Sequence, residues 1–122
     1  MNAAQTLART AAPRNIVREL NDNLRRNFFA PSLHGEVVFT AGVAALRDND
    51  RFALLDEVRC FEDFTPDNDS YGAHDFGRIN FHGERYFWKI DYYDNDLTAH
   101  SPDKFDPALT RCVLTIIRAD GY

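Results

Sequence analysis

Two alternating runs of apolar and polar residues, separated by two residues, constrain the fold of this chain more than any other feature. The runs are DFGRINF at 75–81 and ERYFWKIDYYD at 84–94, with His82 and Gly83 between them. Alternation with a period of two is typical of strands with one buried face, and an X-Gly pair suits a two-residue turn. The pattern therefore predicts an antiparallel hairpin over 75–91 in which the numbers of facing residues sum to 165.

This register assigns a face of the hairpin to each side chain, because a slip of one residue would exchange the two faces. The face predicted to be buried carries Ile79, Phe81, Tyr86, Trp88 and Ile90. Lys89 and Asp91 fall on the opposite face, and the register places His74 opposite Asp91 on that same face. We expect Trp88 and Ile90 in the core and Lys89 away from it.

The segment before the hairpin begins with a helical pattern. Apolar residues at helical spacing predict an amphipathic helix that starts at Pro13 and ends near Pro31. The apolar positions are Ile16, Val17, Leu20, Leu24 and Phe28, and the polar positions include Arg14, Arg18, Arg25 and Arg26. GEVVFT predicts a strand at 36–40. Residues 43–64 favour short helical turns broken at Asp48–Asp50, and 58–64 suit either strand or helix.

The last apolar run completes the predicted sheet. TRCVLTII at 110–117 is apolar on both faces, which favours a central strand. One helix followed by neighbouring strands predicts an α+β fold, with the N-terminal amphipathic helix packed on a small, mainly antiparallel sheet around a central hairpin. A chain of 122 residues has room for one such domain. We expect a flexible leader at 1–12 and a single domain at 13–122.

Composition limits the setting in which the chain works. Residues 1–30 carry a net charge of +3 and the remainder −8, which gives the overall −5. The N-terminal segment lacks the apolar stretch of a secretory signal, and no run approaches the roughly 18 residues of a membrane span. We therefore expect a cytoplasmic protein without membrane contact, with Cys60 and Cys112 as reduced thiols.

The triplet Asp-Asn-Asp occurs three times, at 48–50, 67–69 and 94–96, and raises the question of a metal site. Asp67, Asp69 and Gly72 come closest to a calcium-binding loop. Tyr71 stands where another ligand belongs, however, and Arg78 replaces the glutamate of the twelfth position. Asp and Asn also form turns by bonding their own backbone. We expect turns here, and neither a metal nor a cofactor.

Three residues around the start of the hairpin form the candidate catalytic set. His74 and Asp75 precede the first strand, and Asp91 is predicted to lie opposite His74. A histidine oriented by a carboxylate is half of a general-base arrangement, but a nucleophile such as Ser70 is near only through the loop. The pattern favours a structural pair. A small hydrolase or metal-dependent enzyme centred on these residues is the alternative.

Three blocks of the chain resemble one family. They are NDSYGAHDFG at 68–77, FWKIDYYD at 87–94 and TRCVLTI at 110–116. The chain is similar, from about residue 21 to its end, to small proteins grouped as a domain of unknown function. The family is common on plasmids and mobile elements of alphaproteobacteria. The resemblance therefore implies accessory cargo of a mobile element, and assigns no activity.

The charge balance and this resemblance together suggest a non-enzymatic interaction protein. The hypothesis is an acidic inhibitor, of anti-restriction or anti-CRISPR type, that binds a host protein with a basic surface, such as a nucleic-acid-binding enzyme. The candidate contacts are Asp56, Glu57, Glu62, Asp63, Asp67, Asp69, Asp94 and Asp96. A second alternative is a regulator that binds DNA through the basic N-terminal helix. The acidic body disfavours direct nucleic-acid binding by this route.

Overall fold

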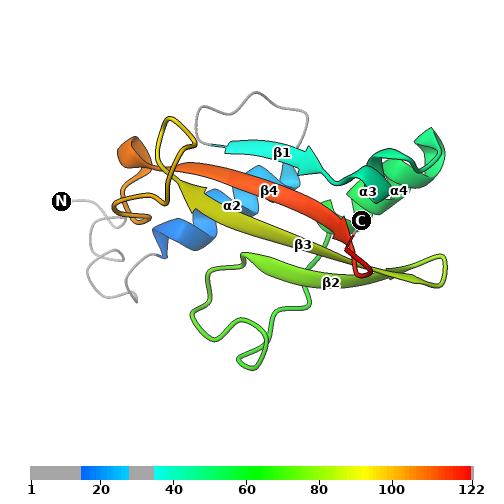
Figure 1. The fold of residues 1–122 in the computed structure, drawn as a ribbon. Coiled ribbons are helices and arrows are strands. Elements are labelled where there is room, and N and C mark those ends of the chain that lie inside the picture. The colour runs from blue at the N-terminus through cyan, green and yellow to red at the C-terminus, as the bar shows by residue number, and fades with distance from the viewer. Residues whose placement is uncertain (1–14, 28–34, 122) are drawn as a thin grey trace.

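The computed structural model describes residues 15–27 and 35–121, which form a four-stranded sheet with helices on one side. The strands are β1 (Gly35–Phe39), β2 (Phe76–Phe81), β3 (Glu84–Tyr93) and β4 (Arg111–Arg118), in the spatial order β1-β4-β3-β2. In Figure 1, helix α2 (Ile16–Arg26) lies behind β3 and β4, so the viewer looks at the opposite face of the sheet. The predicted α+β class is confirmed.

The central hairpin has the predicted register. Phe76 pairs with Lys89 and Phe81 pairs with Glu84, so every facing pair sums to 165. His82 and Gly83 both have positive φ, 50° and 78°, as a two-residue turn of this kind requires. Trp88 is fully buried and Ile90 is 4% exposed, while Lys89 projects from the other face.

The last strand occupies the predicted central position. β4 pairs antiparallel with β3 and parallel with β1, which makes the sheet mixed rather than wholly antiparallel. Its alternate residues Cys112, Leu114 and Ile116 are buried in the same layer as Trp88. We call this side of the sheet the covered face, because α2 and two further helices pack against it.

Helix α2 is shorter than predicted, and its buried face includes two polar residues. Pro13, Phe28 and Pro31 lie outside the described residues. Within Ile16–Arg26 the side chain of Asn15 caps the first turn by accepting from the Arg18 amide. Val17 and Leu24 are buried as expected, but Asn21 and Arg25 are fully buried beside them. The prediction that Arg25 belongs to the polar face is therefore wrong.

Residues 43–64 are mainly helical. Helix α3 (Ala41–Ala44) and helix α4 (Asp48–Arg59) are separated by a short turn, and the chain after α4 is a loop rather than a strand. The first Asp-Asn-Asp triplet is the first turn of α4, where Asp48 and Asp50 complement the helix dipole. Leu54, Leu55 and Val58 of α4 complete the core. No helix of the described ranges is both long and apolar enough to span a membrane.

Candidate functional site

A buried arginine organises the side of the molecule that the helices cover. Arg25 lies on α2 and is fully inaccessible to solvent. Its Nη1 donates to the carbonyl oxygens of Val58, Arg59 and Phe61, at 3.0, 3.1 and 2.8 Å. Its Nη2 donates to Asp22 at 3.1 Å. The guanidinium thus satisfies the carbonyls left free at the C-terminal end of α4, and it fixes the start of the following loop.

Aromatic rings surround this guanidinium. Its central carbon lies 5.4 Å from the ring centroid of Phe64 and 5.3 Å from that of Trp88. Burial lowers the pKa of Arg25, and the hydrogen bond to Asp22 opposes that effect. Cation–π contacts of this kind become stronger when the cation is desolvated. The loop after α4 is therefore tied both to α2 and to the core.

His74 lies next to this arginine, between two carboxylates. Its Nδ1 is 2.9 Å from Asp22 of α2, and its Nε2 is 3.5 Å from Asp69 of the preceding loop. The ring stacks on Phe64 with 3.7 Å between centroids and 5° between planes. The side chains of His74 and Asp69 are 18% and 8% exposed. The histidine therefore links α2, the 61–75 loop and the start of β2.

The predicted opposition of His74 and Asp91 is wrong. His74 has a φ of 55°, and this left-handed residue interrupts the alternation before β2 begins at Phe76. Its ring consequently lies on the helix side, whereas Asp91 pairs with Lys89 at 2.8 Å on the opposite face. Asp75 accepts a hydrogen bond from the Tyr92 hydroxyl at 3.0 Å. The three members of the candidate catalytic set thus have different side-chain partners, and Asp91 lies on the other face of the sheet from His74.

Asn21 and Tyr92 form a buried polar link that periodicity alone did not indicate. The Asn21 amide donates to the Ala73 carbonyl at 3.0 Å and to the Tyr92 hydroxyl at 2.7 Å. The Tyr92 hydroxyl in turn donates a hydrogen bond to the Asp75 carboxylate. Burial raises the pKa of Tyr92 well above its usual range. The link fastens α2 to the start of β2, so its role is structural.

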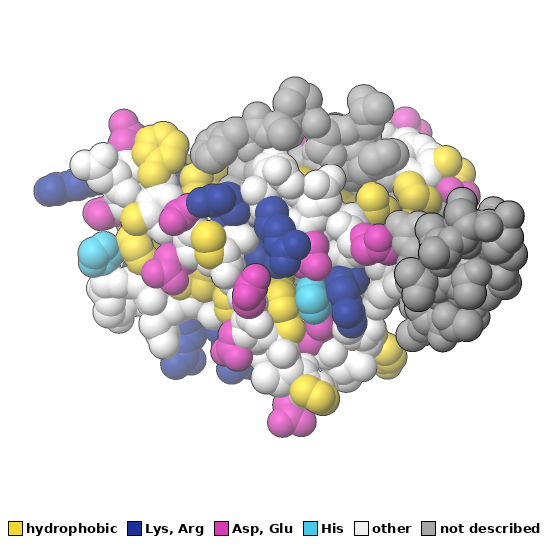
Figure 2. Space-filling view, turned by 180° about the vertical axis from the view of Figure 1, so that it is seen from behind, with side chains coloured by type: hydrophobic (Ala, Val, Ile, Leu, Met, Phe, Trp, Pro, Cys, Tyr) yellow, Lys and Arg dark blue, Asp and Glu magenta, His cyan; other side chains and the backbone are white. Residues whose placement is uncertain are grey.

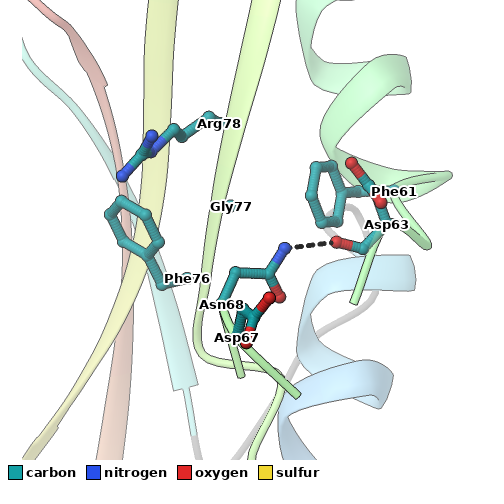
Figure 3. A pocket seen from close by; sticks show the side chains of 7 residues that line it. All are labelled: Phe61, Asp63, Asp67, Asn68, Phe76, Gly77 and Arg78. Carbon is teal, nitrogen blue, oxygen red and sulfur yellow. Dashed lines mark hydrogen bonds between the residues drawn. The ribbon is translucent and has the colours of Figure 1, made fainter. Parts of the chain in front are cut away.

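The loop after α4 and strand β2 border a surface pocket of about 490 Å³. Phe61, Asp63, Asp67 and Asn68 line it from the loop side, and Phe76, Gly77 and Arg78 from the strand. Figure 3 shows Phe76 and Arg78 projecting to one side of β2, with Phe61, Asp63 and Asn68 on the other. A Cβ at Gly77 would collide with the rings of Trp88 and Phe61, so the loop can approach β2 only at a glycine.

The predicted acidic contact residues fall into two separate groups. Asp56, Glu57, Glu62, Asp63 and Asp67 are exposed and lie close in sequence at the end of α4 and in the loop. We call these five residues the acidic segment. Asp94 and Asp96 follow β3, and backbone hydrogen bonds from Thr98 lower the pKa of Asp94. Asp69 belongs to the histidine cluster rather than to the exposed surface.

The acidic segment is only partly neutralised. Asp56 pairs with Arg59, and Glu62 is 4.0 Å from Arg26. Acidic and basic side chains are interspersed over the helix side (Figure 2). Among the described residues, no group of three or more His, Cys, Asp or Glu is placed to hold a metal ion.

The basic side chains predicted for the N-terminal helix do not form one exposed face in the described part of α2. Arg25 is buried, and Arg18 donates through Nε to the Gly72 carbonyl at 2.5 Å. Arg26 remains exposed and lies near Glu62. Arg14 lies outside the described residues.

A comparison with protein families identifies the family to which this chain belongs. The model for "Protein of unknown function (DUF3768)" matches residues 39–121. The chain belongs to the DUF3768 family. The matched region contains the whole hairpin, β4, α4 and the acidic segment, but begins after α2. Arg25 and Asp22 therefore lie outside the match, while His74 and the carbonyls that Arg25 holds lie inside it. No curated protein and no solved structure matches the chain.

Proposed function

We propose that this member of the DUF3768 family is a non-catalytic binding protein that presents its acidic segment to a basic surface on a partner protein. The observation that supports the proposal is the anchoring of this segment. Five exposed carboxylates lie within residues 56–67, and the buried Arg25 holds three backbone carbonyls of the same stretch. A rigid segment loses little conformational entropy on binding, so its charges can be used for affinity and for rapid association.

The geometry around His74 supports binding more than catalysis. Both ring nitrogens face carboxylates, and the ring stacks on Phe64. A shallow depression beside it is lined by Ser70 and Tyr71 among others, yet neither hydroxyl is bonded to the histidine in the described structure. A general base must reach the proton that it abstracts. An arrangement that holds both nitrogens on acidic partners favours a structural histidine.

The partner in this proposal is a cytoplasmic host protein with a basic surface. If the chain is cargo of a mobile element, as its sequence resemblance implies, a host nuclease or defence complex has such a surface in its nucleic-acid channel. An array of carboxylates would occupy the positions that phosphates otherwise take. Steering between opposite charges would speed the encounter at low ionic strength.

Charge reversal in the acidic segment tests the proposal. The test variant is Asp63→Lys with Asp67→Lys, because neither side chain forms a described ion pair. The matched control is Glu84→Lys with Asp120→Lys, which changes the net charge equally at exposed sites outside the candidate contacts. Each tagged protein is incubated with host lysate, and captured proteins are identified by mass spectrometry at about 50 and 500 mM salt, between which screening increases strongly.

The proposal expects a basic partner that the wild type and the control capture and that the test variant does not. Its recovery should fall at the higher salt concentration. His74→Ala should matter only through the stability of the fold. A folded His74→Ala variant without biological activity, beside charge reversals that change nothing, would instead support the enzyme alternative.

A further inference from the structure

The face of the sheet opposite the helices carries a mixture of aromatic and charged side chains. The described helices all pack on the covered face, so the alternate residues of each strand project to the other side, which we call the open face (Figure 1). Its charged residues are Glu36, Arg78, Arg85, Lys89, Asp91 and Arg111. Four cations against two anions give this face a net positive charge in a chain whose overall charge is −5.

The two anions of the open face are already paired. Glu36 lies 2.9 Å from Arg111, and Asp91 lies 2.8 Å from Lys89. Arg78 and Arg85 are exposed, and neither forms an ion pair within the described residues. These two arginines stand on neighbouring strands, with Arg78 facing Phe87 across the hairpin. The excess positive charge therefore belongs to one corner of the face, beside the hairpin.

Two aromatic rings lie beside these cations. Phe76 and Phe87 are diagonal neighbours on β2 and β3, with 5.7 Å between ring centroids and 31° between planes. Phe76 is 37% exposed, and Phe87 is half-buried. In Figure 3 the Arg78 guanidinium lies beside the Phe76 ring, on the side of β2 away from Phe61 and Asp63. A flat ligand that stacks on Phe76 would therefore meet a guanidinium at its edge.

We propose that the open face binds single-stranded nucleic acid, with a base stacked on Phe76 and Phe87 and the phosphates bound by Arg78 and Arg85. A ligand that fits this corner must combine a planar apolar surface with negative charge. A nucleotide strand has both, and aromatic residues on an open sheet are a common platform for unpaired bases. Duplex DNA hides the faces of its bases, so it can use only the arginines.

This inference rests on different side chains from those of the proposed protein-binding function. The expectation that the chain does not bind nucleic acid directly rested on its overall acidity and on the N-terminal helix. Net charge sets long-range attraction, whereas a local cluster of cations decides where a polyanion binds. Figure 3 shows Phe61 and Asp63 on the other side of β2 from Phe76 and Arg78, although Asp63 and Asp67 border the same pocket as these two residues. Because different variants test the two sets of side chains, the two proposals can fail independently.

Fluorescence anisotropy of the full chain with labelled single strands tests the inference. The probe is fluorescein-labelled poly(dT) of about 15 nucleotides, a length within the site size of small single-strand binders. At about 50 mM salt we expect a Kd of roughly 1–100 µM, the range typical of non-specific binding. Arg78→Ala with Arg85→Ala should reduce the salt dependence, by about 0.7 in log–log slope for each lost phosphate contact. Phe76→Ala should weaken binding about fivefold or more.

Matched controls come from the helix side. Arg47→Ala and Phe52→Ala remove an exposed arginine and a phenylalanine that is 55% exposed, and both should leave the affinity unchanged. Circular dichroism confirms that each variant is folded. Asp63→Lys with Asp67→Lys should not weaken binding of the oligonucleotide, which separates this result from the test of the proposed function.

Four results would overturn the inference. They are no saturable binding of poly(dT), equal losses in the helix-side controls, equal affinity for a duplex of the same length, and equal affinity for a polyglutamate peptide. The last would mean that the face recognises negative charge without bases. Sedimentation of the free protein adds one further check: a dimer that Phe76→Ala dissociates, without binding of poly(dT), would assign the face to a second copy of the chain.

Discussion

The two faces of the sheet are built from the same four strands, at alternate residues, yet their side chains do different things. On the covered face Trp88, Leu114 and Ile116 are fully buried and pack against the helices. On the open face the aromatic residues Phe76 and Phe87 stand among cations and remain partly accessible. Alternation assigns each residue to a face, but the helices decide which face becomes a core. The difference predicts stability effects on one face and binding effects on the other.

The two faces also differ in the surroundings of their arginine side chains. The covered side contains a buried guanidinium, Arg25, with four hydrogen bonds to protein oxygens. The open face carries Arg78 and Arg85 in contact with solvent. Burying a charge is costly unless its hydrogen-bonding groups are satisfied, so a buried arginine with many partners holds one arrangement of the chain. An exposed arginine has no such constraint and can exchange water for a ligand.

Trp88→Ala should produce the largest loss of stability. The indole is fully buried and contacts the Phe61 and Phe64 rings and the Arg25 guanidinium. Removing a large core aromatic costs about 3–5 kcal/mol of unfolding free energy, because both apolar burial and packing are lost. Urea denaturation followed by circular dichroism measures this change. A loss below about 1 kcal/mol would mean that the covered face is not the core.

Arg25→Leu should be the next most destabilising change, at about 3 kcal/mol. Leucine fills much of the space, but it removes the donor to the carbonyls of Arg59 and Phe61 and the arginine partner of Asp22. Arg26→Leu is the matched control, since its side chain is 52% exposed, and it should change stability by less than about 0.5 kcal/mol. Equal effects of the two substitutions would contradict the proposed anchoring of the acidic segment.

The hairpin and the central strand could be predicted from sequence because their signals are local. Strict alternation around His82 and Gly83 fixes the register, and an apolar run such as 110–117 suits only a strand with neighbours on both sides. The α+β class followed from these elements and one amphipathic helix. The parallel pairing of β1 with β4 could not be predicted, since it depends on how the chain returns to the sheet.

The candidate site was predicted less well, because its contacts depend on three-dimensional packing. His74 was predicted to lie opposite Asp91, but its left-handed backbone directs it to Asp22 and Asp69. Arg25 occupies a position that periodicity alone assigns to solvent. One signal in the sequence could have indicated it: Asp22 three residues earlier can pair with Arg25 along the helix. The three carbonyl partners have no sequence signature.

The buried thiol of the covered face should make stability depend on pH in the alkaline range. Burial raises the pKa of Cys112 from 9.0 to about 11. The folded protein therefore holds its proton more tightly than the unfolded chain. The associated stability is complete below about pH 9 and is lost as the pH rises through about 11, on the order of 2 kcal/mol. Chemical denaturation between pH 8 and 11 should show a steeper fall for the wild type than for Cys112→Ala, with Cys60→Ala as the exposed control.

Phe76→Ala should have the smallest effect on stability, and it gives the sharpest test of the comparison between the two faces. The ring is 37% exposed and contacts Phe87 on the open face, so its removal opens no cavity in the core. We expect a loss below about 1 kcal/mol, the range of a single cross-strand aromatic contact. Denaturation of Phe76→Ala and Trp88→Ala under identical conditions measures the ratio of the two effects. A loss at Phe76 as large as that at Trp88 would show that the open face is itself packed in the free protein, and would remove the basis for assigning it to a ligand.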